Sequence, residues 1–334
     1  MIADLRARPM HIEERAGTRE ARVDGPPPRP GELLLACIDD TAQAQTVLAH
    51  AAEVAAALGR SLAVAHVIDS GSADRPRDPL DWTVKRHRCR DRLRALAAGA
   101  SGTAAEQVLL EGPPADRVLS WVEANKATIL AFGTRRRQIA GPMLLGSNAA
   151  RLMSAAPGSV LLVPPEASAE ADYRRILVPL DGSARAESVL PAAVAMARLY
   201  GSEILLLHVV PPAELTEVGP LECEALDLRD RLRRRNQRVA RAYLDRIAAR
   251  FRPTFRVRTL MTLGDARDCI REIAVQEKAD LVLLSGQGHG LRPDGAFGKV
   301  AAHLAASAEA PILIVRDAAP AAAARAGRPI LFQS

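Results

Sequence analysis

Short apolar runs alternate with longer stretches of helical periodicity along most of the chain. The first run, residues 33–38, is followed by Asp39, and the alanine-rich stretch after it keeps apolar residues at helical spacing as far as Gly59. Runs this short and unbroken are typical of parallel strands that are buried on both faces. Further strands are predicted at residues 61–68, 106–110, 128–132 and 160–163, with helices between them, one of which covers residues 81–98.

The same order of elements occurs a second time. A shift of 142 positions superimposes Leu35 and Asp39 on Leu177 and Asp181, and the shift becomes 152 later because the second copy is longer between its second and third strands. One helix is expected between the first strand of this copy and Gly201, and a long polar helix at residues 222–250. Strands of the second copy are predicted at residues 175–180, 203–210, 255–261, 280–284 and 312–315. The pattern predicts an α/β protein with two tandem doubly wound parallel-sheet domains of five strands each.

Polar and proline-containing segments separate and flank the two copies. The predicted order is a flexible N-terminal tail (1–31), a first domain (32–164), a linker (165–173), a second domain (174–316) and a C-terminal tail (317–334). Both tails are expected to be mobile.

Composition narrows the classes of partner. The charge of +6 comes from 45 Lys and Arg against 39 Asp and Glu, but only 3% of residues are aromatic, which argues against a nucleic-acid partner. No run approaches the roughly 20 apolar residues of a membrane-spanning helix, so a cytoplasmic protein without membrane contact is expected. The four cysteines are too far apart in sequence for a zinc or redox pair, and Cys37 is predicted to lie in the core.

Candidate chemistry lies after the first strands, because ligands of open parallel sheets bind at the carboxyl ends of the strands. Asp39 and Asp181 stand there, and each either contacts a ribose or magnesium ion or caps the following helix. His66 and His208 end the second strands and are interpreted as satisfied structural histidines, since the sequence shows no other metal ligand near them.

The loops after the fourth strands are the second candidate. In the second copy Ser285, Gly286, Gly288 and His289 precede Gly298 and Lys299 at a helix start, and such a loop is either a phosphate cradle or a flexible turn. Three arginines, including Arg135 and Arg136, follow Gly133 in the first copy, with Gly146 and Ser147 at the helix start. These arginines either grip a phosphate or form a solvated basic loop.

Together these features resemble the universal stress protein family, in its tandem form. They include strands that end in His-Val, Gly-x-x-x-Asp before the third helix and Lys-Ala-Asp-Leu-Val at residues 278–282. The motif G-x2-G-x9-G-[S/T], which binds ATP in one branch of that family, is kept in spacing in both copies. Arg136 replaces its second glycine in the first copy, and in the second copy Ser285 and Lys299 replace its first glycine and its hydroxyl residue.

The resemblance implies an ATP site, with or without Mg²⁺. In it Asp39 and Asp181 lie by the ribose and phosphates, and Leu62 and Ile204 line the adenine. The second copy is favoured. Its implied nucleotide contacts are Asp181, Ile204, Ser285, Gly286, Gly288, His289, Gly298, Lys299 and Val300, against Asp39, Leu62, Gly133, Arg136, Gly146 and Ser147 in the first.

The resemblance also implies a stress-response regulator that binds ATP and acts on an unidentified protein partner. No residue forms an evident base for an attacking water, so no dedicated catalysis is expected, although weak ATP hydrolysis is open. Pairing of the last strands, residues 160–163 with 312–315, would give an internal pseudo-dimer. Association of two chains into a homodimer is a further alternative. The alternatives are a scaffold with degenerate motifs that binds no nucleotide, and a weak hydrolase or adenylyl-transferring enzyme that uses His289.

Overall fold

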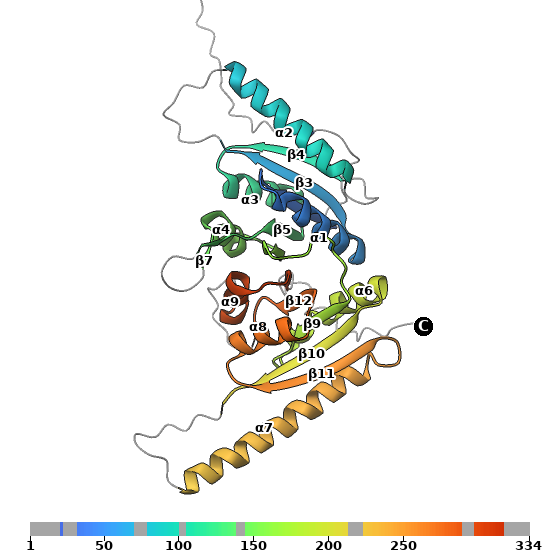
Figure 1. Cartoon of the computed structure of the whole chain (residues 1–334), viewed down its shortest axis with the longest axis vertical. Helices are drawn as coiled ribbons and strands as arrows, with labels where there is room; N and C mark the ends of the chain where they lie inside the picture. Colours follow the sequence, from blue (N-terminus) through green and yellow to red (C-terminus); the bar gives the residue numbers. More distant parts are fainter. Residues whose placement is uncertain are drawn as a thin grey trace, which may run out of the picture.

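One continuous sheet runs through both halves of the molecule (Figure 1). The computed structural model describes residues 21–22, 32–69, 79–99, 105–137, 144–212, 223–288 and 297–316. Eleven strands are hydrogen-bonded in the order β1-β4-β3-β2-β5-β8-β13-β12-β9-β10-β11. The first half contributes β2 (Leu33–Ile38), β3 (Ser61–Ile68), β4 (Glu106–Glu111), β5 (Ile129–Gly133) and β8 (Ser159–Val163), and the second half contributes β9 (Arg175–Pro179), β10 (Glu203–Val210), β11 (Arg256–Leu263), β12 (Leu281–Ser285) and β13 (Ile312–Val315).

Within each half these five strands are parallel, as the unbroken apolar runs predicted. The halves meet where β8 and β13 pair antiparallel, with Leu161 opposite Leu313. This is the pairing that was expected of the two last strands, and it makes the chain an internal pseudo-dimer.

Helices cover both faces of the sheet. One face carries α1 (Gln43–Ala57), α2 (Pro79–Gly99), α5 (Ala184–Glu187), α6 (Leu190–Tyr200) and α7 (Cys223–Ala249). The other carries α3 (Pro114–Asn125), α4 (Ser147–Ala155), α8 (Ala266–Gln276) and α9 (Lys299–Ser307). Each face buries one apolar core that continues from one half into the other. In Figure 1, α2 lies along the upper end of the molecule and α7 along the lower end.

Three local features depart from the sequence prediction. The helix expected before Gly201 is broken into α5 and α6, because Pro191 in the first turn of α6 lacks the N–H that a continuous helix needs. Ala21–Arg22, placed in a flexible tail by the sequence, forms the short strand β1 antiparallel to β4. A small hairpin, β6 (Arg136–Arg137) with β7 (Leu144–Leu145), stands in the loop after β5.

The linker was predicted as a polar spacer, but one of its side chains is part of the core. Tyr173 is fully buried between the halves. Its hydroxyl is 2.7 Å from Nδ1 of His50 on α1, and its ring packs edge-on against Tyr200 on α6, with ring centroids 5.6 Å apart. The linker therefore holds α1 and α6 together.

Cys37, Cys89 and Cys269 are free thiols. Cys37 is packed against the core, as predicted, and burial raises the pKa of its thiol to about 12. Six arginines lie exposed on α7: Arg229, Arg231, Arg233, Arg234, Arg235 and Arg238. None of the helices in the described part of the chain is long and apolar enough to span a membrane.

Candidate functional site

Asp39 and Asp181 form the same turn in the two copies. Oδ1 of Asp39 accepts the backbone N–H of Thr41 at 3.0 Å, and Oδ1 of Asp181 accepts that of Ser183 at 2.9 Å. The capping hydrogen bond of α5 itself comes from Ser183, whose hydroxyl accepts the N–H of Ala186 at 3.0 Å. One carboxylate oxygen thus orders the turn before the helix, and the second oxygen, Oδ2, points to the loop after the fourth strand.

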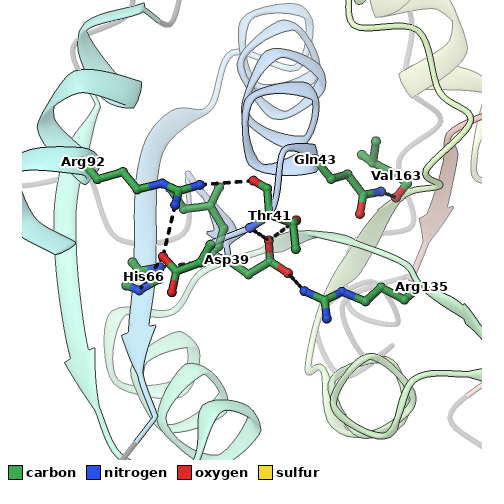
Figure 2. A network of polar contacts seen from close by, with 9 residues as sticks. Asp39, Thr41, Gln43, His66, Arg92, Arg135 and Val163 are labelled. Atoms are coloured by element: carbon green, nitrogen blue, oxygen red, sulfur yellow. Dashed lines mark hydrogen bonds and ion pairs between the residues drawn. The ribbon is translucent and has the colours of Figure 1, made fainter. Parts of the chain in front are cut away.

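In the first copy an arginine forms an ion pair with that second oxygen (Figure 2). Nη2 of Arg135 lies 2.5 Å from Oδ2 of Asp39. Burial by itself would raise the pKa of Asp39, but the hydrogen bonds from Thr41 and Arg135 outweigh it and hold that pKa below its usual value. The carboxylate is therefore ionised and already used by the protein.

Other side chains fill the rest of the first site. Nε2 of Gln43 donates to the carbonyl of Val163 at 2.8 Å, and its Oε1 would lie only 2.8 Å from a Cβ placed on Gly133. Arg92, from α2, donates to Asp40 at 3.4 Å and to the carbonyl of Thr41 at 3.2 Å. Arg136 belongs to the β6–β7 hairpin. Gly146 and Ser147 follow this hairpin in the sequence, as the N-cap and the first residue of α4.

In the second copy a backbone segment without a side chain faces Asp181. A Cβ placed on Gly288 would lie 2.4 Å from Oδ2 of Asp181, far closer than such atoms can approach. Only glycine fits here without a shift of the carboxylate or the loop. Gln287, which corresponds to Arg135, accepts a hydrogen bond from Arg185 at 3.0 Å.

The ends of the second glycine loop are fixed by backbone hydrogen bonds. The N–H of Gly286 donates to Val315 at 2.8 Å, and the N–H of Gly298 donates to Gly286 at 2.7 Å. The second bond places the start of α9, at Lys299 and Val300, directly beside Gly286. The hydroxyl of Ser285 donates to the carbonyl of Gln287 at 2.9 Å, so it stabilises the loop where the family motif has glycine. His289 lies outside the described residues.

A groove of about 640 Å³ opens on the other side of Asp181, between α7 and the ends of β9 and β10. Asp181, His208, Asn236, Tyr243 and Arg246 are among the residues that line it. In the first copy the space beside His66 is filled, because Arg92 and Leu93 of α2 pack there with Asp40. The second aspartate thus lies between a glycine loop and a groove, and the first lies among side chains.

Leu62 and Ile204, predicted to line the adenine, lie at the wrong end of their strands. Each is the second residue of its strand and is fully packed in the core, paired with Leu34 and Ile176 respectively. The carboxyl ends, where the aspartates lie, are reached several residues later. These two aliphatic side chains therefore do not lie beside the other predicted site residues.

Val67 and Val209 lie at the end of the strands where Leu62 and Ile204 were expected. They are partly buried near the carboxyl ends of β3 and β10, on the face that also carries the helices after the glycine loops. Their position after the histidine of each strand was the signal that could have identified them. The histidines themselves are satisfied as predicted, since Nδ1 of His66 lies 3.2 Å from the carbonyl of Ile38 and Nδ1 of His208 lies 2.7 Å from that of Leu180.

Comparison with known proteins gives the family. The family model for the universal stress protein family matches residues 33–164 and again residues 172–316. The chain belongs to the universal stress protein family. A universal stress protein of Mycolicibacterium smegmatis is 24% identical over 298 residues, which cover 85% of this chain and 96% of the relative. A shorter one from Thermus aquaticus is 28% identical over 144 residues, which cover 43% of this chain and 99% of the relative.

A solved structure shows the same fold. A universal stress protein from Archaeoglobus fulgidus, 17% identical, superimposes with a TM-score of 0.60 and covers 86% of this chain and 98% of its own. Another universal stress protein, 19% identical, was solved in complex with cAMP and covers 43% of this chain with a TM-score of 0.33. In this universal stress protein the two aspartates have unlike surroundings.

Proposed function

We propose that this universal stress protein binds an adenine nucleotide, ATP first of all, at Asp181 in its second half, and that the bound nucleotide regulates a protein partner. The observation that carries the proposal is the contact between Gly288 and Asp181, where a Cβ would lie 2.4 Å from the carboxylate. Because Gly288 carries no side chain, a ribose hydroxyl can donate to the carboxylate and phosphate can approach the loop amides.

The charges around the loop fit a nucleotide. Lys299 is exposed in the first turn of α9, where the unpaired backbone amides of a helix also attract anions. The lysine takes the place of a hydroxyl residue in the family motif, and its ammonium would offset phosphate charge without orienting it as a hydroxyl does. A magnesium ion would be held by the phosphates and Asp181, since the described residues contain no group of three metal-ligating side chains.

The same geometry favours regulation over dedicated catalysis. Asp181 is engaged by Ser183 and packed against Gly288, so it is poorly placed to take a proton from an attacking water. Any ATP hydrolysis should therefore be slow. The competing function is a scaffold that binds no nucleotide, and the substitutions at Lys299 and Ser285 favour it.

Calorimetric titration of the full chain with ATP and magnesium tests the proposal, with cAMP as a second probe because it carries the same adenosine on a single phosphate. Gly288→Ala should weaken ATP binding by at least about tenfold, because the new methyl group displaces the carboxylate or the loop. Gly146→Ala is the matched control: it also lies in a copy of the motif, but its Cβ meets nothing within 4 Å, so binding should not change.

Native mass spectrometry of freshly purified protein supplies the second readout. One ATP or ADP per chain, lost in Gly288→Ala and kept in Gly146→Ala, is the expected result. Absence of binding at millimolar ATP with magnesium would overturn the proposal in favour of the scaffold. Equal binding by wild type and Gly288→Ala would overturn the assignment of the site.

A further inference from the structure

Two grooves lie where the halves meet, at opposite ends of the β8–β13 pair, and the sequence repeat relates them. Lys126, Ala127 and Thr128 line one groove, and their counterparts Lys278, Ala279 and Asp280 line the other. His50 on α1 lines the second groove, and its counterpart on α6, Ala192, lines the first. We call them the open groove, at Lys126, and the linker groove, at Lys278.

The linker fills much of the linker groove. Nε2 of His50 donates to the carbonyl of Ser168 at 3.0 Å, and Tyr173 is buried against His50 and Tyr200. Its backbone carbonyl also accepts the hydroxyl of Ser202. The space left in this groove is about 270 Å³.

The open groove has the matching walls and, among the described residues, no segment equivalent to the linker. The counterparts of Tyr200, Ser202 and His50 are Leu58, Arg60 and Ala192, and all three line it. Its volume is about 640 Å³. Most of the wall is apolar, with Leu58, Val122, Ile129, Pro191, Leu313 and Val315 contributing. An apolar groove of this size, exposed to water, favours a covering segment.

The chain itself leaves the sheet at the open groove. Arg316, the residue after β13, lines the groove, and its backbone N–H donates to Ser159 at 3.2 Å. It corresponds to Pro164, from which the linker departs after β8. Residues 317–334 follow Arg316 in the sequence and include the apolar cluster Ile330, Leu331 and Phe332. The residues between Arg316 and Ile330 can span at most about 45 Å, far more than the groove requires.

We propose that the cluster Ile330–Phe332 docks into the open groove of its own chain, with one apolar side chain in the place that Tyr173 takes in the linker groove. The repeat supplies the geometry, because each segment leaves the last strand of its half at the same point. The walls supply the chemistry, because most of the exposed wall is apolar and matches an apolar cluster, while Arg60, Glu123, Lys126 and Arg316 also line it. The sequence alone had assigned residues 317–334 to a mobile tail.

Hydrogen–deuterium exchange of the full chain tests this docking. The double variant Leu331→Asp with Phe332→Asp should speed amide exchange in segments 57–60 and 122–128 by about tenfold, equivalent to about 1.4 kcal/mol of local stability. Exchange in segment 274–280, at the linker groove, should stay unchanged. The control variant Ala322→Asp with Ala323→Asp puts the same charges in the same tail and should leave both grooves as in wild type.

Ala192→Glu probes the groove from the other side and should release residues 326–334 to unprotected exchange while the linker groove stays protected. Unprotected exchange of residues 326–334 in the wild type would overturn the proposal. So would groove protection that survives the double variant, or a co-purified small molecule that accounts for it in native mass spectra. Protection that fades on dilution would assign the groove to a second copy instead and overturn docking within one chain.

Discussion

In the first half Oδ2 of Asp39 lies 2.5 Å from Arg135, whereas in the second half Oδ2 of Asp181 faces the backbone of Gly288. Arg135 and Gln287 hold the same position in the two loops, but Arg135 pairs with Asp39 whereas the side-chain oxygen of Gln287 accepts from Arg185. The two copies share strands, turn and loop. The side chain at this loop position therefore differs in charge and in partner between the two copies.

The grooves between the halves repeat this contrast between a filled and an open site. The linker groove is filled by Tyr173, and the open groove is lined by the counterparts of the residues that hold it. In both comparisons the strands are the same and the difference lies in the side chains and segments beside them, so each comparison can be tested by substitution.

The largest effect on stability is expected when Tyr173, which fills the linker groove, is removed. Tyr173→Ala should lower the free energy of unfolding by about 3–5 kcal/mol, as for other buried aromatic side chains cut back to alanine. Tyr173→Phe removes only the hydrogen bond to His50 and should cost about 1 kcal/mol. Chemical denaturation followed by circular dichroism measures both. Equal stability of the two variants would show that the ring does not hold the halves together.

The next effect concerns the first aspartate. Arg135→Gln combined with Arg136→Gly gives the first loop the residues found at the matching positions of the second. The variant should then bind two ATP molecules per chain in native mass spectra instead of one, with the new site the weaker because Gln43 and Arg92 remain. A count that stays at one would contradict the role given to the arginine loop.

The smallest effect is a change in pH dependence. Arg135→Gln should raise the pKa of Asp39 toward its ordinary value, which NMR titration can follow, whereas Arg92→Gln, which removes a contact to Asp40, should leave it unchanged. A carboxyl with a lowered folded-state pKa stabilises the fold above its unfolded pKa of about 3.9, and that stabilisation is lost as the pH falls through the folded pKa.

Because Asp39 and Arg135 are both about half exposed, solvent screening limits the contribution to about 0.5 kcal/mol at neutral pH. The wild type should lose this advantage over Arg135→Gln in acid. A stability difference that persists unchanged to the lowest pH would rule out the ion pair as its cause.

The sequence predicted the strands well because their side chains face a core on both sides. Buried parallel strands such as β3 and β10 need unbroken apolar runs, and a run of that kind has few other uses in a chain with no membrane-length segment. The antiparallel junction was also predicted, since it uses the last run of each copy. The helix break at Pro191 was missed because the alanine-rich pattern continues on both sides of it, although a proline inside such a pattern indicates a break.

The site was predicted less well because its residues are determined by how far along each strand they lie and by how closely two loops approach each other. Leu62 and Ile204 have the right chemistry for an adenine wall, but strand length puts Val67 and Val209 at the edge instead. The pairing of Arg135 with Asp39 depends on how two loops approach each other, and no local pattern encodes that distance. Tyr173 stands in a polar segment and showed no periodicity that would mark it as core.

The join between β8 and β13 has a consequence for how the protein changes over generations. Two separate subunits encoded by one gene inherit every substitution in both copies, so a residue that closes one site closes the other. Here the paired halves are encoded by different stretches of one gene, and their pairing does not weaken on dilution, because the linker keeps each near the other. Arg135 and Lys299 were therefore free to arise independently, one in each half, without disturbing the strand pair that keeps them together.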